Sequence, residues 1–314
     1  MPWYWLGTWS LGGEHFGKSD GREVLAMLQQ AIHSGFCHFD SALFYAHGRS
    51  IDMLSKILKN RRQDLFIVAK GGLSWQGKRV IHRADALTLR QTLHDTLKRL
   101  GTDYLDCYQL HWPDPNIPLE ESIHTLKALQ TEGLIRYWGV ANLPADTLTQ
   151  HIPMHTHIPH QVHFNPLVKS HDILTAGHQQ QRCLNCITSP LEQGLLSTFR
   201  KTLNDLGKKD FRRKNRLFHN ASIQQWRKDL EPLQKQSDVP LEILALLWIL
   251  SFNTVDAIIP GPRSRQQLLT LMTLTDWMEK LSLHWNQRDD WSKKLEQQVG
   301  NTLWKHLNNA PNTV

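Results

Sequence analysis

The feature of the sequence that most constrains the fold is a regular alternation between short apolar runs and longer amphipathic segments. The short runs are rich in β-branched and aromatic residues, as buried strands are. The segments between them carry apolar residues at three- and four-residue spacing, as helices do. Strands are expected at 3–9, 36–42, 65–72, 104–112, 136–143, 160–167, 185–191 and 255–261. Eight strands separated by helices predict an α/β fold with the parallel sheet closed into a (β/α)8 barrel.

Glycines at the expected C-terminal ends support the prediction of these helices. The expected helices include 20–34, 84–100 and 119–132, which end at Gly35, Gly101 and Gly133 respectively, as helices with glycine C-caps do. The rival architecture is an open doubly wound sheet, which usually carries G-x-G-x-x-G after its first strand. The stretch "LGTWSLGG" at 6–13 lacks that spacing, so the barrel is favoured.

The length fits one such domain. The chain has 314 residues, and α/β barrels of about 250 residues commonly fold as single domains. We expect the barrel to occupy residues 1–280 and a C-terminal helical segment, 281–314, to pack on it. Within that segment a helix is expected over 285–304, with its apolar face formed by Trp285, Trp291, Leu295 and Val299.

Composition narrows the class of protein. The formal net charge of +7 is mild, and the only dense basic run is "GKKDFRRKNR" at 207–216, which is either a solvated loop or a clamp for an anionic ligand. No aromatic residues interleave with the charges as a nucleic-acid platform requires, so nucleic acid is not expected as a partner. No apolar stretch is long enough for a membrane span. The start of the chain lacks the pattern of a secretory signal, so a cytoplasmic location is expected.

Cysteines and histidines do not predict a metal site. Cys183 and Cys186 form a C-x-x-C, but the chain has no second pair, and the motif does not open a helix after a strand. Cys37 and Cys107 lie in apolar runs and are expected to be buried. The histidines of 151–163, at positions 151, 155, 157, 160 and 163, are expected in a solvated connector because two prolines interrupt them.

Polar residues stand where three neighbouring strands are expected to end. Asp40 ends the second strand and Tyr45 follows on its loop, Lys70 ends the third strand, and His111 ends the fourth. In a barrel, reactive groups lie at this C-terminal rim. A tyrosine with its ordinary pKa of about 10 is a weak acid, and an adjacent ammonium would lower that pKa toward the working range. Asp40 would hold Lys70, and His111 would orient a carbonyl oxygen.

The surroundings of these residues resemble the aldo-keto reductases. The family's Asp-x-Ala-x-x-Tyr pattern stands at 40–45, followed by Gly48-Arg49-Ser50. "RLGTDYLDCYQLHWPDP" at 99–115 is similar to its most recognisable segment. "EGLIRYWGVANL", "QVHFNPL", "SPLEQGLLS" and "IIPGPRSRQQL" resemble its later strands and its phosphate-end motif. The resemblance covers about residues 6–280, and it implies NAD(P)H-dependent reduction of aldehydes and ketones without a Rossmann fold.

Residue by residue, the resemblance implies a site. Asp40, Tyr45, Lys70 and His111 match the catalytic tetrad. The implied cofactor-binding residues are Thr8, Trp9, Asp40, Asn142, Gln161, Ser189, Pro190, Leu191, Arg212, Gly261, Arg263 and Gln267. Arg263 favours NADPH over NADH, because a guanidinium can pair with the additional 2′-phosphate. The basic run is similar to a family cover loop, with Asp210 and Arg212 in register, which favours the clamp.

The sequence also departs from the family pattern. Ala141 stands where a Ser usually lies beside the carboxamide, Thr188 replaces an aromatic residue under the nicotinamide, and Leu271 replaces an Asn near the adenine. The segment before Gly7 is short, which implies a truncated N-terminal hairpin and a partly bare apolar barrel floor that favours self-association, unless initiation lies upstream. The alternative function is a nucleotide-sensing regulatory subunit of the same fold. A metal-dependent barrel hydrolase is disfavoured by Lys70 among the strand ends.

Overall fold

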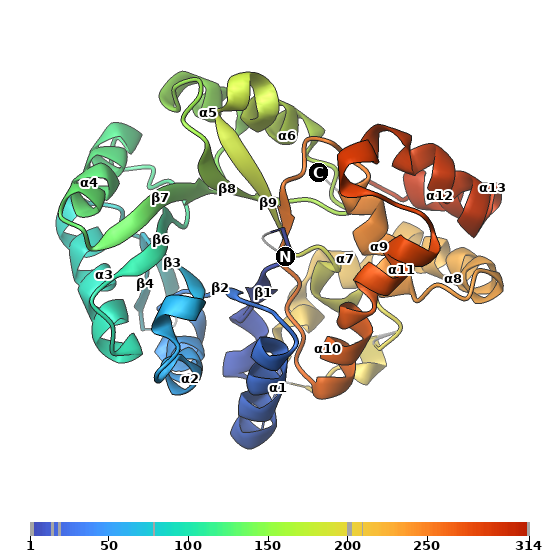
Figure 1. The fold of residues 1–314 in the computed structure, drawn as a ribbon, viewed down its shortest axis with the longest axis horizontal. Helices are drawn as coiled ribbons and strands as arrows, with labels where there is room; N and C mark the ends of the chain where they lie inside the picture. The colour runs from blue at the N-terminus through green and yellow to red at the C-terminus, as the bar shows by residue number, and fades with distance from the viewer. Residues whose placement is uncertain are drawn as a thin grey trace.

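The protein is described here from a computed structural model, which describes residues 3–13, 16–17, 20–77, 79–199, 203–208 and 210–312. Eight parallel strands follow one another around a barrel in the order in which they occur in the sequence (Figure 1). They are β1 (Leu6–Gly7), β2 (His38–Asp40), β3 (Phe66–Gly71), β6 (Leu105–Leu110), β7 (Ile135–Ala141), β8 (Ile158–His163), β9 (Cys183–Thr188) and β10 (Ala257–Ile258). The predicted (β/α)8 barrel is confirmed.

The first and last strands close the barrel. Tyr4 and Ile258 form a parallel bridge, and the Trp5 N–H donates to the Ile258 carbonyl at 3.0 Å. Both strands are shorter than predicted, with two residues each where seven were expected. The backbone after β10 comes very close to β1, because a Cβ placed on Gly7 would lie only 3.3 Å from the Ile259 side chain.

Helices surround the strands (Figure 1). On the first six units they are α1 (Gly21–His33), α2 (Arg49–Leu58), α3 (Ala86–Leu100), α4 (Leu119–Thr131), α5 (Ala145–His151) and α6 (His171–His178). The three glycine caps are confirmed, because Gly35, Gly101 and Gly133 all have positive φ, between 69° and 87°. Leucine, isoleucine and alanine side chains of α1, α3 and α4 face the strands and join one continuous core.

The connection from β9 to β10 is longer than the others. It holds α7 (Arg216–His219), α8 (Ala221–Gln236) and α9 (Leu241–Leu250), and β10 is followed by α10 (Arg265–Met272) and α11 (Leu274–Lys280). Every residue of α9 is buried, because α9 is covered on its outer side by later helices. Among the described residues, no helix combines the length and the apolar character that crossing a bilayer requires.

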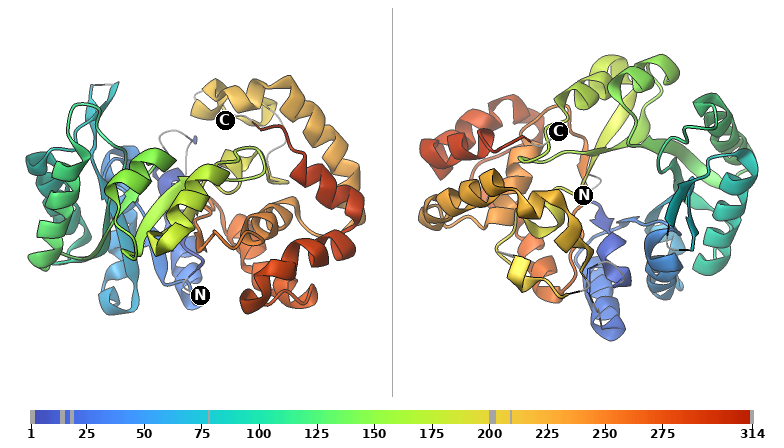
Figure 2. Two further views of the ribbon diagram at one scale, coloured as in Figure 1. Left: turned by 90° about the horizontal axis from the view of Figure 1, so that it is seen from above. Right: turned by 180° about the vertical axis from the view of Figure 1, so that it is seen from behind.

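The C-terminal residues pack against this long connection (Figure 2). They form α12 (Trp291–Val299) and α13 (Asn301–Asn308), separated at Gly300 with φ of 94°. The single helix expected over 285–304 is therefore wrong, since the backbone turns at this glycine and residues 285–290 form a 3-10 helix. Trp248 of α9 donates its indole N–H to Asn308 at 2.7 Å, which ties the segment to the barrel.

A hairpin that the sequence patterns did not predict follows β3. It consists of β4 (Leu73–Gln76) and β5 (Arg79–His82), paired antiparallel. At the opposite end of the barrel, the floor is filled by Trp5, His38 and Phe66, whose rings lie 5.0 to 6.2 Å apart. The floor also exposes apolar side chains: Tyr137 is 54% and Leu184 41% exposed.

Candidate active site

Asp40 and Lys70 meet inside the barrel at the ends of β2 and β3. The Lys70 Nζ lies 2.7 and 2.6 Å from the two carboxylate oxygens of Asp40. Both side chains are almost fully buried, at 1% and 6% exposure. Parallel pairing sets the contact, because Asp40 lies opposite Val68 and Lys70 is two residues further along on the same side of β3. A buried carboxylate and ammonium require each other, since either one alone would lose its hydration without compensation.

Tyr45 completes this cluster from the loop after β2. Its hydroxyl oxygen lies 3.4 Å from the Lys70 Nζ, and its ring is buried. The loop reaches this position through a 3-10 turn (Tyr45–Gly48) in which Ala46 and His47 have φ of 49° and 53°. Non-glycine residues rarely adopt this left-handed region, and such strain is typical of functional loops. The turn thus directs the phenol toward the ammonium.

His111 follows β6 and packs edge-on against the Tyr45 ring, with 5.6 Å between the centroids. It is 8% exposed, and its Nδ1 has no hydrogen-bond partner among the residues that the structure describes. Asn142 donates its side-chain amide to the His111 carbonyl at 3.0 Å. The four residues predicted from the strand ends are therefore brought together in one cluster.

Electrostatics assigns charge states to the cluster. Burial is the largest single effect and would lower the pKa of Lys70, but the interactions with Asp40 and Tyr45 together outweigh burial and raise that pKa, so Lys70 stays an ammonium. Burial, followed by the Lys70 charge, lowers the pKa of His111 well below its ordinary value, so the imidazole is neutral.

The effect on Tyr45 differs from the sequence-based expectation. Lys70 does act to lower the pKa of the phenol, as expected, but burial is the larger effect and leaves the pKa of Tyr45 above its ordinary value. The expectation that the ammonium would bring this pKa toward the working range is therefore wrong. The phenol keeps its proton at neutral pH and can donate it.

A groove of about 490 Å³ opens from this cluster. Asp40 and Tyr45 lie at one end, and two arginines, Arg212 and Arg263, lie elsewhere in its wall. Nine of the twelve residues predicted to bind the cofactor line it: Trp9, Asp40, Ser189, Pro190, Leu191, Arg212, Gly261, Arg263 and Gln267.

The other three predicted cofactor residues do not line the groove, because each is engaged inside the barrel. Thr8 is fully buried and donates its hydroxyl to Ser41 or to the Asp40 carbonyl, both at 2.9 Å. Gln161 donates its amide to the Asp40 carboxylate at 2.5 Å. Asn142 contacts His111, as described above. In this structure these three residues hold the cluster in place rather than facing the groove.

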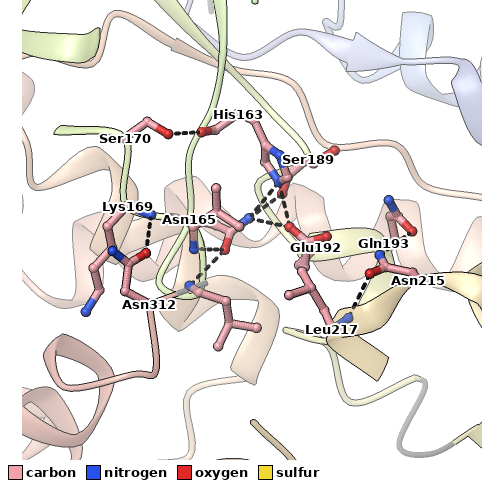
Figure 3. Close-up of polar contacts among 12 residues, drawn as sticks. His163, Asn165, Lys169, Ser170, Ser189, Glu192, Gln193, Asn215, Leu217 and Asn312 are labelled. Atoms are coloured by element: carbon pink, nitrogen blue, oxygen red, sulfur yellow. Dashed lines mark hydrogen bonds and ion pairs between the residues drawn. The ribbon is translucent and has the colours of Figure 1, made fainter. Parts of the chain in front are cut away.

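The segment 189–193 forms one wall of the groove, and a polar network holds it (Figure 3). Asn165 donates its amide to the Ser189 carbonyl at 3.0 Å and to the buried Glu192 carboxylate at 2.9 Å. His163 contacts the same carboxylate through Nε2 at 2.6 Å. The backbone here is left-handed, with φ of 49° at Ser189 and 42° at Glu192. Sequence reasoning missed this network, although an acidic residue after "SPL" was a visible signal.

The basic run contributes a roof to the groove. The ring centroid of Phe211 lies 5.7 Å from that of Trp9 and 5.3 Å from that of Phe16, so two loops that are far apart in the sequence touch. Asp210 and Arg212 form a buried pair at 2.6 Å. Burial alone would raise the pKa of Asp210, but hydrogen bonds from Arg212 outweigh it and hold the pKa below its usual value. Arg212 of this run therefore lines the groove while paired with Asp210, and Lys209 of the run lies outside the described residues.

Comparison with known protein families identifies the family to which the chain belongs. The family model described as "Aldo/keto reductase family" matches residues 5–276, which is most of the chain. The chain belongs to the aldo/keto reductase family. It is therefore an oxidoreductase that uses a nicotinamide cofactor.

Relatives support this assignment over most of their length. Aldo-keto reductase YhdN of Bacillus subtilis is 28% identical over 281 residues, which is 87% of this chain and 84% of YhdN. The NADH-specific methylglyoxal reductase of Escherichia coli is 27% identical, over 84% of this chain and 86% of its own. The glycerol dehydrogenase AKR11B4 of Gluconobacter oxydans has the same fold, with a TM-score of 0.75 and 23% identity, over 94% of this chain and 92% of its own.

The groove of this aldo/keto reductase fits a nicotinamide dinucleotide. Its inner end holds the charged cluster, its middle offers Pro190 and Leu191, and its arginines can meet phosphates. Ser189, with its left-handed backbone, stands in the groove wall, and the buried His111 Nδ1, which has no hydrogen-bond partner among the described residues, lies on the ring that packs against Tyr45. Two of the three departures from the family pattern, Thr188 and Leu271, line the groove. The third, Ala141, is buried at the end of β7.

The two cysteines of the C-x-x-C lie in β9. Cys183 and Cys186 are buried, and burial raises the pKa of both thiols, to about 12 for Cys183. His160 and His163 lie in β8, so the solvated connector expected over 151–163 is wrong at these positions. Within the described part of the chain, no three His, Cys, Asp or Glu side chains are grouped to hold a metal ion.

Proposed function

We propose that this aldo/keto reductase reduces an aldehyde or ketone with NADPH, with Tyr45 donating the proton to the carbonyl oxygen. The observation that carries the proposal is the contact of Tyr45, Lys70 and Asp40 at the inner end of the groove. A phenol that keeps its proton, beside an ammonium that can stabilise the phenolate left behind, is suited to protonate an alkoxide.

Each residue of the cluster has a separate task. Lys70 stabilises the negative charge that develops on the Tyr45 oxygen as the proton leaves. Asp40, held by Gln161, fixes the ammonium in place. His111 is neutral and can donate a hydrogen bond to the carbonyl oxygen, which orients the substrate. The nicotinamide, when bound, would supply the hydride.

The choice of NADPH over NADH rests on Arg263. This side chain donates to the Gly17 carbonyl at 2.9 Å and lies over the Phe16 ring, on the wall of the groove. A guanidinium there can pair with a 2′-phosphate, which NADH lacks. Because a relative is NADH-specific, both cofactors must be measured. We expect Arg263→Gln to weaken NADPH binding about tenfold and to leave NADH binding nearly unchanged. Equal effects on the two cofactors would contradict the assignment.

The decisive variant is Tyr45→Phe. It removes only the hydroxyl, so NADPH should bind as in the wild type while turnover of an aldehyde panel falls by about 10²–10⁴-fold. Fluorescence titration measures the first quantity, and NADPH oxidation measures the second. Val162→Ala, at a buried position of β8, is a control for a mild change outside the site. Full activity in Tyr45→Phe would rule out the role of this residue as the acid.

A nucleotide-sensing subunit remains the second candidate, because Thr188 lines the groove where the family has an aromatic residue. Such a protein would bind NADPH and leave every aldehyde of the panel unreduced. We also propose a cytoplasmic location and a small-molecule carbonyl substrate. Cell fractionation tests the location, and the aldehyde panel tests the substrate class.

A further inference from the structure

A second groove, larger than the cofactor groove, lies outside the barrel. Its volume is about 1000 Å³, and it is bounded by the loop 43–47, strand β4 and helix α3. We call it the α3 groove. Its lining shares no residue with the cofactor groove and includes none of the four residues of the catalytic cluster. A ligand in the α3 groove would therefore not occupy the cofactor groove.

One wall of the α3 groove is aromatic and apolar. The rings of Phe44 and Trp75 are stacked, with centroids 4.6 Å apart and an angle of 8° between the planes. The Trp75 indole donates to the Phe44 carbonyl at 3.2 Å, which fixes the pair, and His47 lies 5.1 Å from the same indole. Leu87 of α3 is 77% exposed in this wall. Such a surface suits a flat apolar group.

The other part of the lining is cationic. It contains Arg83, Lys98 and Arg99 against a single carboxylate, Asp95. Arg99 already pairs with Asp52 at 3.2 Å. The side-chain nitrogens of Arg83 and Lys98, by contrast, make no hydrogen bond or ion pair with any residue that the structure describes. Two cations that face a groove without such partners favour an anionic ligand.

We propose that the α3 groove binds a small molecule with a flat apolar body and one anionic group, an aromatic carboxylate or sulfonate. The apolar body would lie against Phe44, Trp75 and Leu87. The anionic group would meet Arg83 and Lys98.

The position of the groove connects it to the catalytic loop. Phe44 directly precedes Tyr45, and its ring packs edge to face with that of His111, with 6.1 Å between the centroids. On the same loop, the Arg99 guanidinium donates to the His47 carbonyl at 3.3 Å, so this arginine contacts the loop directly. A ligand in the α3 groove therefore contacts the back of the segment that carries Tyr45. It should modulate the site without competing for the cofactor groove.

The test is calorimetric titration of the full chain with 2-naphthoate, in saturating NADPH so that the cofactor groove is filled. The wild type should bind one equivalent. Arg83→Glu/Lys98→Glu should bind roughly tenfold more weakly, because two ion pairs are replaced by repulsion. The matched control is Lys228→Glu/Lys235→Glu, which makes the same change of net charge on exposed positions of α8 and should bind as the wild type does.

Two further measurements separate this site from the substrate pocket. The neutral analogue 2-naphthalenemethanol should bind at least about tenfold more weakly than the carboxylate. The NMR signal of the Trp75 indole N–H, assigned by its loss in Trp75→Phe, should shift when 2-naphthoate is added. The proposal is overturned if the wild type shows no saturable binding, if the Arg83/Lys98 variant binds as tightly as the wild type, if the α8 control loses binding equally, or if the neutral analogue binds equally well.

Discussion

Replacing Lys70 with methionine tests the electrostatics of the site most directly. Methionine preserves most of the length and volume of the side chain, so the main change is loss of the ammonium. The Asp40 carboxylate, 6% exposed, would keep only the Gln161 amide among its present side-chain partners. Removing one member of a buried ion pair typically costs about 3–5 kcal/mol, because the other charge is left without compensation. We expect Lys70→Met to lose that amount of free energy of unfolding at neutral pH.

The double variant Asp40→Asn/Lys70→Met provides the control. It removes both charges and keeps an oxygen that can accept the Gln161 hydrogen bond. Since no unpaired charge remains, it should be more stable than Lys70→Met by at least about 2 kcal/mol, although it carries one more substitution. Urea unfolding followed by circular dichroism measures both, with equal m-values as the check that the same transition is compared.

The double-mutant comparison can refute the reasoning in two ways. The first refuting result is a loss of less than about 1 kcal/mol in Lys70→Met, which is the range of a solvent-exposed ion pair. The second is a double variant that is as unstable as Lys70→Met or less stable still. Either result would mean that water or another cation compensates Asp40, and the role of Lys70 as a buried ammonium beside Tyr45 would then be lost.

Three further predictions follow from the same structure. Carbonyl reduction should stay independent of pH up to about pH 9, since the raised pKa of Tyr45 keeps the phenol protonated, and a rate that falls with an apparent pKa near 7 would contradict this. Burial lowers the pKa of His160 from 6.5 to about 4, so the unfolded state takes up the proton first and stability falls as pH decreases between these values. From pH 7 to pH 5 this proton uptake removes about 2 kcal/mol of the free energy of unfolding. In His160→Gln, urea unfolding should show a loss over the same pH range that is smaller by about 2 kcal/mol. Phe211→Ala removes ring contacts with Trp9 and Phe16, worth about 0.5–1.5 kcal/mol each. NADPH should therefore dissociate roughly tenfold faster in a stopped-flow chase. An unchanged rate would argue against the basic run covering the groove.

The catalytic cluster was predictable because of where the polar residues stand in the sequence. Asp40, Lys70 and His111 each follow an apolar run, and in a parallel barrel such positions converge at one rim. Their identification needed only the order of the strands, which neighbouring hydrophobic runs already indicate. Most of the groove wall, including the segment after β9, was instead implied by the resemblance to the aldo-keto reductases.

Contacts between side chains from distant segments were not predictable in the same way. Gln161 was expected to face the cofactor, but its amide reaches Asp40, since β8 and β2 lie across the barrel within hydrogen-bonding distance. Phe16 and Phe211 stand in loops without periodicity, so no pattern indicated that they would touch. The break at Gly300 depends on packing against α8, which an apolar repeat does not encode.

The sign of the Tyr45 shift shows why residue identity alone does not determine function. An ammonium beside a phenol lowers the phenol's pKa, but enclosing both groups in a barrel rim removes water from the phenolate, and in this structure the second effect is larger. The same enclosure strengthens the interaction between Lys70 and any charge that forms on the Tyr45 oxygen, because little solvent remains to screen it. Burial therefore holds the proton on Tyr45 in the ground state, while the ammonium stabilises the charge as the proton leaves. This combination is suited to proton donation during carbonyl reduction. The reverse reaction requires the phenolate, so alcohol oxidation should need a higher pH than reduction does.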